Sequence, residues 1–408
     1  MKVLMFGWEF PPVYSGGLGT ACYGLTKALA KKGVEITFVM PQGPLDIKGD
    51  FVNLLIANNL AITNITIKKV ASLLSPYSGS EDYYQRYQKI MQTKGNAEAA
   101  LYGYNLHHEV YRFSEIAKLI AESEDFDVIH CHDWMTFPAG INAKQIKNKP
   151  LIVHIHATEF DRTGGNGVNQ YVYDLEKTGM QLADMVIANS HHTKHLIINH
   201  YGIPPEKITV IHNAVDFSDG NFQQFRIRKE DKLVLFLGRI TLQKGPDYFI
   251  EAAKMVLEKD PDVKFIVVGS GDMEAAMIQR AAQLGIGSKV LFAGFLKGEE
   301  RDRIYKMADV YVMPSVSEPF GITPLEAMVR NTPTIISKQS GVSEVLRNCL
   351  KVDFWDVEEL ANKILGVLTY RHMHNELTIL GYHEVLQFSW DFPADKCIEL
   401  YDKFGGRT

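Results

Sequence analysis

The sequence has few cysteines, no long apolar run and no strong excess of charge of either sign. Its four cysteines in 408 residues lie far apart and form no C-x-x-C pair, so neither a disulfide framework nor a cysteine-based zinc site is expected. No window approaches the roughly 18 consecutive apolar residues that a spanning helix needs, and no cleavage-site pattern follows the first apolar segment. These absences predict a cytoplasmic protein without integral membrane association.

The overall charge gives no reason to expect a nucleic acid partner, because the formal net charge is −5. Hydrophobic residues make up 46% and charged residues 22% of the chain, which are ordinary globular values. A length of 408 residues exceeds what one ordinary core accommodates, so two or more domains are expected. The sequence does not indicate an oligomeric state.

Short apolar runs alternate with helical patterns along most of the chain. Residues 2–7 read as a buried parallel strand, followed by a loop rich in proline and glycine, a helical pattern over 21–32 and a strand over 34–40. The same alternation of strand and helix continues along the chain, and a second series of it begins with a strand at 232–237. It predicts an α/β protein with two doubly wound parallel sheets.

The predicted domains follow this restart. A first domain is expected over 1–217, a second over 218–385, and a C-terminal segment over 386–408. Residues 43–113 interrupt the rhythm with patterns that look helical, and we expect a helical insertion there. Its tyrosines either pack that insertion or offer aromatic faces to sugar rings. They are Tyr77, Tyr83, Tyr84, Tyr87, Tyr102, Tyr104 and Tyr111.

Two glutamates frame a predicted helix start in the second domain. Thr323, Pro324 and Glu326 suit the N-cap, first and third helical positions, which is a capping box. Glu318 lies on the preceding loop with Gly321, and a capping role does not explain it. A helix N-terminus after a glycine-containing loop offers free N–H groups and a positive dipole end, which suit a pyrophosphate.

Two cations follow the first strand of the second domain. Arg239 and Lys244 stand between Gly238 and Gly245 in the sequence Gly-Arg-Ile-Thr-Leu-Gln-Lys-Gly. Two fixed cations at this place could stabilise negative charge that develops on a bound group, and could replace a metal ion. The alternative is that both are solvated surface residues.

The first domain holds candidates at the ends of its strands. Gly16 and Gly17 open a helix, as either a tight turn or a phosphate-binding turn, although G-x-G-x-x-G is absent. Asp133 follows His130-Cys-His132 at the carboxyl end of a strand, where open α/β sheets bind ligands. A metal site in this His-x-His-Asp run is disfavoured, because successive strand residues point to opposite faces.

These elements together resemble the GT-B retaining glycosyltransferases of families 4 and 5, most closely the glycogen and starch synthase group. The stretch from Glu318 to Glu326 resembles the E-x7-E motif, and residues 238–245 resemble the G-R-x4-K-G element. Residues 130–134 resemble H-x-H-D-W, and residues 388–391 resemble the F-S-W-D tail. The similarity runs in order from Gly16 to Phe404, although Tyr14 and Ser15 stand where glycogen synthases carry a lysine-containing turn.

The resemblance implies two Rossmann-like domains that face each other across a cleft, with a C-terminal helix crossing back to the first, acceptor-binding domain. It implies that Glu318 faces the donor sugar and that Glu326 binds the ribose. Arg239 and Lys244 would neutralise the diphosphate, and His156 would lie beside the sugar, with His154 in the core; Asp133 is a further candidate catalytic residue. The remaining nucleotide-binding positions would be Gly16, Gly17, Phe320, Gly321, Ile322 and Thr323.

The activity implied is transfer of a hexose, expected to be glucose, from ADP-glucose or UDP-glucose with retention of configuration. The expected acceptor is a glucan or maltooligosaccharide, and no cofactor or metal ion is expected. A family 4 transferase acting on a lipid or a small sugar is the main alternative. A sugar-nucleotide epimerase and a binding protein with a dead site are the others. Nothing in the sequence decides the nucleotide base.

Overall fold

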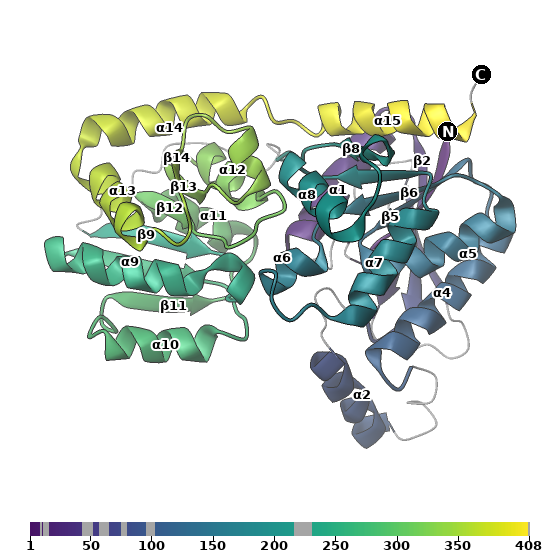
Figure 1. Cartoon of the computed structure of the whole chain (residues 1–408), viewed down its shortest axis with the longest axis horizontal. Coiled ribbons are helices and arrows are strands. Elements are labelled where there is room, and N and C mark those ends of the chain that lie inside the picture. The colour runs from purple at the N-terminus through teal and green to yellow at the C-terminus, as the bar shows by residue number, and fades with distance from the viewer. Residues whose placement is uncertain are drawn as a thin grey trace.

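The computed structural model describes residues 1–8, 10, 16–42, 52–56, 65–74, 80–94, 103–215 and 231–406. Their strands form two sheets, of eight strands and of six, which lie in two α/β units placed side by side (Figure 1). Both units contain buried, nearly continuous apolar strands, as expected for parallel sheets that are covered by helices on both faces.

The first sheet has the strand order β3-β4-β2-β1-β5-β6-β7-β8. Every pairing in it is parallel except that of β3 with β4. The strands are β1 (Lys2–Phe6), β2 (Glu35–Gln42), β3 (Val52–Ile56), β4 (Ile65–Ala71), β5 (Val128–His132), β6 (Leu151–Ile155), β7 (Met185–Ala188) and β8 (Ile208–Val210). The helices among them are α1 (Gly17–Lys31), α2 (Ser80–Lys94), α4 (Leu106–Ser123), α5 (Phe137–Lys147), α6 (Glu159–Thr163), α7 (Gln170–Leu182) and α8 (His191–Leu196), with short helical turns η2 (Trp134–Thr136), η3 (Ile197–Tyr201) and η4 (Pro205–Lys207).

The second sheet is wholly parallel, with the order β11-β10-β9-β12-β13-β14. Its strands are β9 (Lys232–Leu237), β10 (Val263–Val268), β11 (Val290–Gly294), β12 (Val310–Met313), β13 (Thr334–Ser337) and β14 (Leu350–Val352). Its helices are α9 (Pro246–Lys259), α10 (Glu274–Gln283), α11 (Gly298–Met307), α12 (Ile322–Val329), α13 (Val357–Thr369) and α14 (Arg371–Val385), with turns η5 (Leu242–Lys244) and η6 (Gly341–Glu344). The expected change of domain at 217/218 falls between β8 and β9, outside the described residues.

The last helix, α15 (Asp391–Gly405), crosses back onto the first unit (Figure 1). Trp390 packs so closely against α1 that a Cβ added to Gly24 would meet its ring at 2.2 Å. Tyr401 is fully buried beside β5, and Lys32 pairs with Asp395 at 2.8 Å. The predicted α/β architecture with a returning C-terminal helix is confirmed.

The expectation of a helical insertion over residues 43–113 holds only for the later part of this range. β3 and β4 lie within this range and extend the first sheet at its edge, before α2 and the start of α4. The β-branched residues of Ile-Thr-Ile-Lys-Lys-Val suit a strand, and this strand pairs with β2, a partner distant in sequence. Tyr83 is buried, whereas the side chains of Tyr84, Tyr104 and Tyr111 are mostly exposed. Tyr77 and Tyr102 lie outside the described residues.

Among the described residues, no helix has both the length and the apolar composition that crossing a membrane requires.

Candidate active site

A small pocket opens at the carboxyl ends of β9 and β12. Its lining includes Gly238, Lys244, Ser315, Glu318 and Thr323. Lys244 Nζ donates a hydrogen bond to Glu318 Oε2 at 2.5 Å, and Ser315 Oγ donates to the same oxygen at 3.1 Å. The structure therefore joins two of the predicted catalytic residues, 74 positions apart, in one charge-assisted contact.

The turn that positions Lys244 depends on glycine. Lys244 ends η5, and Gly245 follows with φ of 64°, a left-handed conformation. A Cβ at Gly245 would meet the carbonyl oxygen of Pro314 at 2.2 Å. The turn can therefore approach the loop after β12 only because this residue has no side chain. That approach brings the ammonium group of Lys244 to the Glu318 carboxylate.

The backbone of Glu318 is held by the loop after β13. Its N–H donates to the carbonyl oxygen of Gln339 at 2.9 Å, and its own carbonyl oxygen accepts from Gly341 N at 2.9 Å. Glu318 also forms an isolated parallel bridge with Ser340. Because Glu318 is only 6% exposed, its carboxylate is fixed in position at the wall of the pocket.

Arg239 is held beside this site by a residue that the sequence analysis did not select. Its Nη2 donates to Gln243 Oε1 at 3.0 Å, and Gln243 is buried. Among the described residues, the pocket lining includes Lys244 but not Arg239. The two predicted cations therefore share the segment after β9 but contact different groups.

The helix α12 begins differently from the prediction. Its N-cap is Gly321, with φ of 102° and no side-chain cap, so the predicted capping box of Thr323 and Glu326 is wrong. The reason is that Thr323 lies inside the first turn, where its Oγ1 accepts a hydrogen bond from the Tyr311 hydroxyl at 2.8 Å. An N-terminus without a side-chain cap leaves N–H groups available for an anion.

Glu326 is bound by α11 instead. Its Oε2 accepts from the Tyr305 hydroxyl at 3.1 Å, and its Oε1 lies 3.2 Å from Arg301 Nη1. Phe320 and Ile322 are also buried. Their side chains contribute to packing, so a nucleotide at this helix start would meet Phe320 and Ile322 mainly through backbone groups.

In the first unit, Asp133 and His156 are adjacent. Asp133 follows β5 with φ of 62°, and its Oδ1 accepts from the backbone N–H groups of His156 at 2.7 Å and Ala157 at 3.3 Å. Burial raises the pKa of Asp133 to about 7, although the charge of Arg162 opposes this shift. Burial lowers the pKa of His156 to about 3, so this ring is neutral at pH 7.

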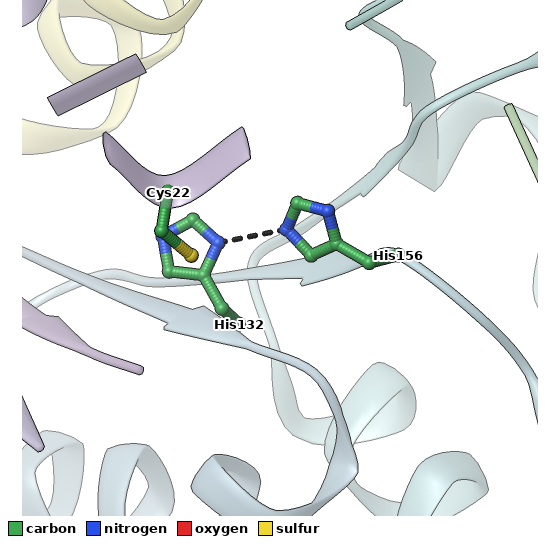
Figure 2. Close-up of side chains that lie close together, drawn as sticks. All are labelled: Cys22, His132 and His156. Carbon is green, nitrogen blue, oxygen red and sulfur yellow. Dashed lines mark hydrogen bonds between the residues drawn. The ribbon is translucent and has the colours of Figure 1, made fainter. Parts of the chain in front are cut away.

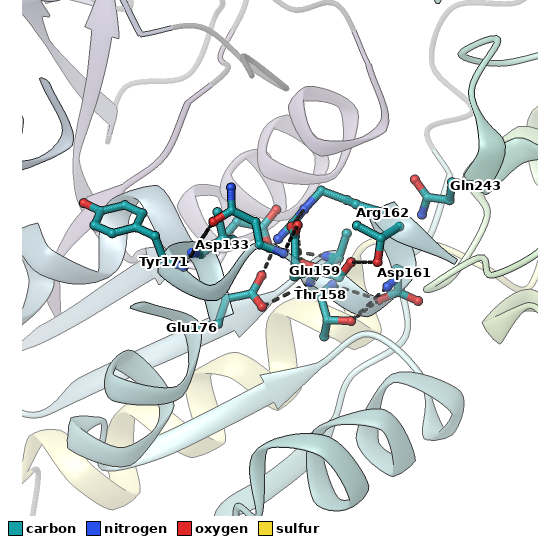
Figure 3. A network of polar contacts seen from close by, with 12 residues as sticks. Asp133, Thr158, Glu159, Asp161, Arg162, Tyr171, Glu176 and Gln243 are labelled. Carbon is teal, nitrogen blue, oxygen red and sulfur yellow. Dashed lines mark hydrogen bonds and ion pairs between the residues drawn. The ribbon is translucent and has the colours of Figure 1, made fainter. Parts of the chain in front are cut away.

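A buried charge network surrounds Asp133 (Figure 3). Arg162 contacts Glu159 at 3.0 Å and also pairs with Glu176, and both glutamates are buried. The network reaches the second unit where Ser317 Oγ donates to Asp161 Oδ1 at 2.6 Å. The sequence analysis missed these residues, although Thr158 and Asp161 at capping-box spacing were a readable signal.

The loop that carries Glu318 also contacts the start of α8 in the first unit. Ser190 Oγ donates to the carbonyl oxygen of Pro319 at 2.5 Å, and His192 Nε2 lies 3.2 Å from Ser317 Oγ. The two neighbours of Glu318 in sequence are thus both bound to the first unit. Their contacts couple the position of Glu318 to the relative placement of the two units.

Gly16 is the N-cap of α1, and Gly17 is its first residue. The loop before them, residues 11–15, lies outside the described residues. Among the described residues, no atom lies within 4 Å of a Cβ placed on Gly17. Its proposed approach to a phosphate stays a prediction.

Two α/β units, a returning C-terminal helix and a pocket at the strand ends of the second unit are the arrangement of the GT-B fold. The chain belongs to the glycosyltransferases: the profile described as Glycosyltransferase Family 4 matches residues 15–219, and that of Glycosyl transferases group 1 matches residues 218–382.

Three similar proteins agree with this placement. An uncharacterized glycosyltransferase of Methanocaldococcus jannaschii, MJ1607, is 30% identical, with 98% of each chain covered. A glycogen synthase of Mycobacterium tuberculosis is 27% identical over 85% of this chain and 80% of its own length. The structure of a sucrose-phosphate synthase from Thermosynechococcus elongatus matches with a TM-score of 0.76 at 19% identity, with 98% of each chain covered.

Proposed function

We propose that this glycosyltransferase transfers glucose from a nucleoside diphosphate sugar to a glucan or maltooligosaccharide, with retention of the α configuration. The observation that carries the proposal is the contact of Lys244 with Glu318 in the pocket at the strand ends. An ammonium group suits the diphosphate, and a carboxylate suits the hydroxyl groups of a sugar. The uncapped start of α12 adds N–H donors for a phosphate.

In the proposed reaction, the acceptor hydroxyl oxygen bonds to the anomeric carbon on the face from which the diphosphate leaves. The bond from that carbon to the diphosphate oxygen breaks, and the hydroxyl proton passes to the departing phosphate. Lys244 and Arg239 stabilise the leaving charge, so this step needs no metal ion. Glu318 orients the sugar, His156 and Asp133 face it from the first unit, and Glu326 binds the ribose.

The glucan acceptor rests on one comparison in particular. The glycogen synthase of Mycobacterium tuberculosis shares 27% identity over 85% of this chain, a span that includes both units. A small sugar or a lipid acceptor would use the same donor site, so the acceptor assignment can fail while the donor assignment stands.

The direct test offers UDP-glucose, ADP-glucose and GDP-mannose, each labelled in the sugar, with maltooligosaccharide, small sugar phosphates or lipid extract. We expect label to enter maltooligosaccharide from one of the glucose donors, and NMR of the product to show a new α linkage. Label in a small sugar or a lipid alone would overturn the glucan assignment. Donor binding without transfer to any acceptor would overturn the assignment of the transferase reaction to these substrates.

A further inference from the structure

Four histidines lie on one face of the first sheet, in a group that we call the histidine ladder. His130 and His132 alternate on β5, and His154 and His156 alternate at the end of β6. His132 and His154 are direct partners in the parallel register of the two strands. Residues two apart in a strand share a face of the sheet. The four rings can therefore lie together, although directly successive strand residues point to opposite faces. All four are at least nine-tenths buried.

The ladder is only half satisfied by hydrogen bonds. His130 Nδ1 lies 2.6 Å from the Tyr401 hydroxyl, and His132 Nδ1 lies 2.9 Å from His156 Nε2. Four buried ring nitrogens of the ladder have no hydrogen-bond partner among the described residues: Nε2 of His130 and of His132, and both nitrogens of His154. Each orphaned buried polar atom costs about 1–3 kcal/mol, so four in one cluster call for a ligand.

We infer that His130, His132 and His154 form a binding site for a divalent transition metal ion. One nitrogen from each ring lies within 4.8 Å of the others, and imidazole nitrogens are the donors that zinc, copper and nickel ions take. In a tetrahedral zinc site at about 2.0–2.1 Å, the ligating nitrogens lie about 3.3 Å apart. To close the site around the ion, the three rings, whose centroids now lie 4.5–5.5 Å apart in stacked or tilted pairs, would turn so that one nitrogen of each points to a common centre.

The existing hydrogen bonds already form an outer shell for such an ion. A ligating histidine normally donates its second ring N–H to a neighbouring acceptor. With Nε2 on the ion, His130 Nδ1 donates to the Tyr401 hydroxyl, and that hydroxyl is itself bonded to Cys397. In the same way His132 Nδ1 donates to His156 Nε2. Each ligand of β5 is thus oriented by a buried partner.

The outer shell gives the ion two structural consequences. Through Tyr401 the ion fastens α15 to the first sheet. This helix lies on the first unit, and its C-terminal end points away from the second unit (Figure 1). Through His132 it fixes the tautomer of His156, because a ring that accepts at Nε2 must carry its proton on Nδ1. His156 is the histidine that follows β6 beside Asp133, so the ion acts as a positioning group for the first unit's side of the site.

A second group overlaps this one. The sulfur of Cys22 on α1 lies with ring nitrogens of His132 and His156 within 4.8 Å (Figure 2). We favour the three-histidine set because the hydrogen bond between His132 and His156 already occupies nitrogens of the second group. Variants of Cys22 and His154 separate the two sets, because each residue belongs to one set only.

The test uses the full chain, expressed without a histidine tag in zinc-supplemented medium and desalted before elemental analysis. We expect zinc in a one-to-one ratio, and a lower Tm after its removal by a strong chelator. Loading the metal-free chain with Co²⁺ should give the intense visible bands of tetrahedral cobalt. His154→Phe should lose the metal and the chelator effect, while being no less stable than the metal-free wild type, since it replaces an orphaned polar ring.

His372→Asn is the matched control, because His372 is exposed on α14 with 86% of its side chain accessible. It should retain the metal and the shift in Tm. Failure of the wild-type chain to bind either Zn²⁺ or Co²⁺ would overturn the proposal. The histidine ladder would then be part of the core without a metal ion. Metal lost in Cys22→Ser but kept in His154→Phe would overturn the three-histidine set. If His154→Phe does not fold, the wild-type metal content and cobalt spectrum still decide the question, and neither depends on transferase activity.

Discussion

The two α/β units place their polar groups in different ways. The second unit carries Lys244 and Glu318 on loops after its strands, where they line a pocket. The first unit buries its polar groups within and directly after the strands, as the histidine ladder and Asp133 show. The charges of the second unit can therefore reach a ligand, whereas Arg162, Glu159 and Glu176 of the first unit bind one another.

This difference suggests a different role for each unit. A reachable ammonium–carboxylate pair can exchange its internal contact for contacts with a diphosphate and a sugar. A buried network such as that of Arg162, Glu159 and Glu176 cannot do so without leaving charges unpaired. It suits the task of holding Asp133 and His156 in place.

The largest expected effect is on the stability of the first unit. Arg162→Met should lower the free energy of unfolding by about 3–5 kcal/mol, because it leaves two buried carboxylates without their cation. Urea denaturation measures this. Arg280→Met is the control, since Arg280 pairs with Glu251 on the surface and should cost under about 1 kcal/mol. Equal losses in the two variants would remove the contrast between buried and reachable charges.

The next effect concerns activity in the second unit. Lys244→Ala should lower kcat by about 100-fold or more, the scale of about 3 kcal/mol for one preorganised donor. Donor consumption under saturating acceptor measures it. Lys254→Ala on α9 is the control, because Lys254 pairs only across one helical turn with Glu258 among the contacts described. A loss of less than tenfold in Lys244→Ala would exclude the proposed role.

A third effect is a pH dependence confined to the first unit. The folded chain holds the Asp133 proton more tightly than the unfolded chain, because burial raises its pKa from 3.8 to about 7. This group therefore makes stability fall as the pH rises from about 4 to 7. Asp133→Asn has no carboxyl group to ionise at this position. Its free energy of unfolding should therefore rise relative to that of the wild type, by up to about 1.4 kcal/mol per pH unit in that window. A difference that does not vary with pH would contradict the raised pKa.

The smallest effect tests the support of Glu318. Ser315→Ala removes one hydrogen bond to Oε2 and leaves the bond from Lys244. The expected loss is about 1 kcal/mol of transition-state stabilisation, roughly fivefold in kcat/KM. Ser123→Ala, at the end of α4, removes a hydrogen bond far from the pocket and should leave kcat/KM unchanged. Equal kinetics in both variants would show that Lys244 alone positions Glu318.

The sequence allowed the fold and the central pair to be predicted because both depend on local order. Strands followed by glycine-containing turns give the parallel sheets, and residues just after neighbouring strands meet at one edge. Lys244 and Glu318 each follow such a strand, β9 and β12. Their spacing to nearby glycines was readable without knowing any distant contact.

Other features depend on partners far away in the chain. The prediction of a helical insertion missed the strands β3 and β4, because β4 gains its stability from pairing with β2. The capping box was wrong because the Tyr311 hydroxyl bonds to Thr323 inside the helix. The histidine ladder depends on the register of β5 against β6, which aligns His132 with His154. None of these contacts follows from composition or spacing.

The central claim is that Lys244 and Glu318 form the site for a sugar nucleotide. Calorimetric titration of UDP and ADP into the wild type, Lys244→Ala and Lys254→Ala, without metal ions, tests it most directly. We expect one of the nucleotides to bind the wild type and Lys254→Ala at one site with equal affinity, and to bind Lys244→Ala at least about tenfold more weakly, the equivalent of 1.4 kcal/mol. Equal affinity in all three proteins, or binding of neither nucleotide to the wild type, would contradict the claim.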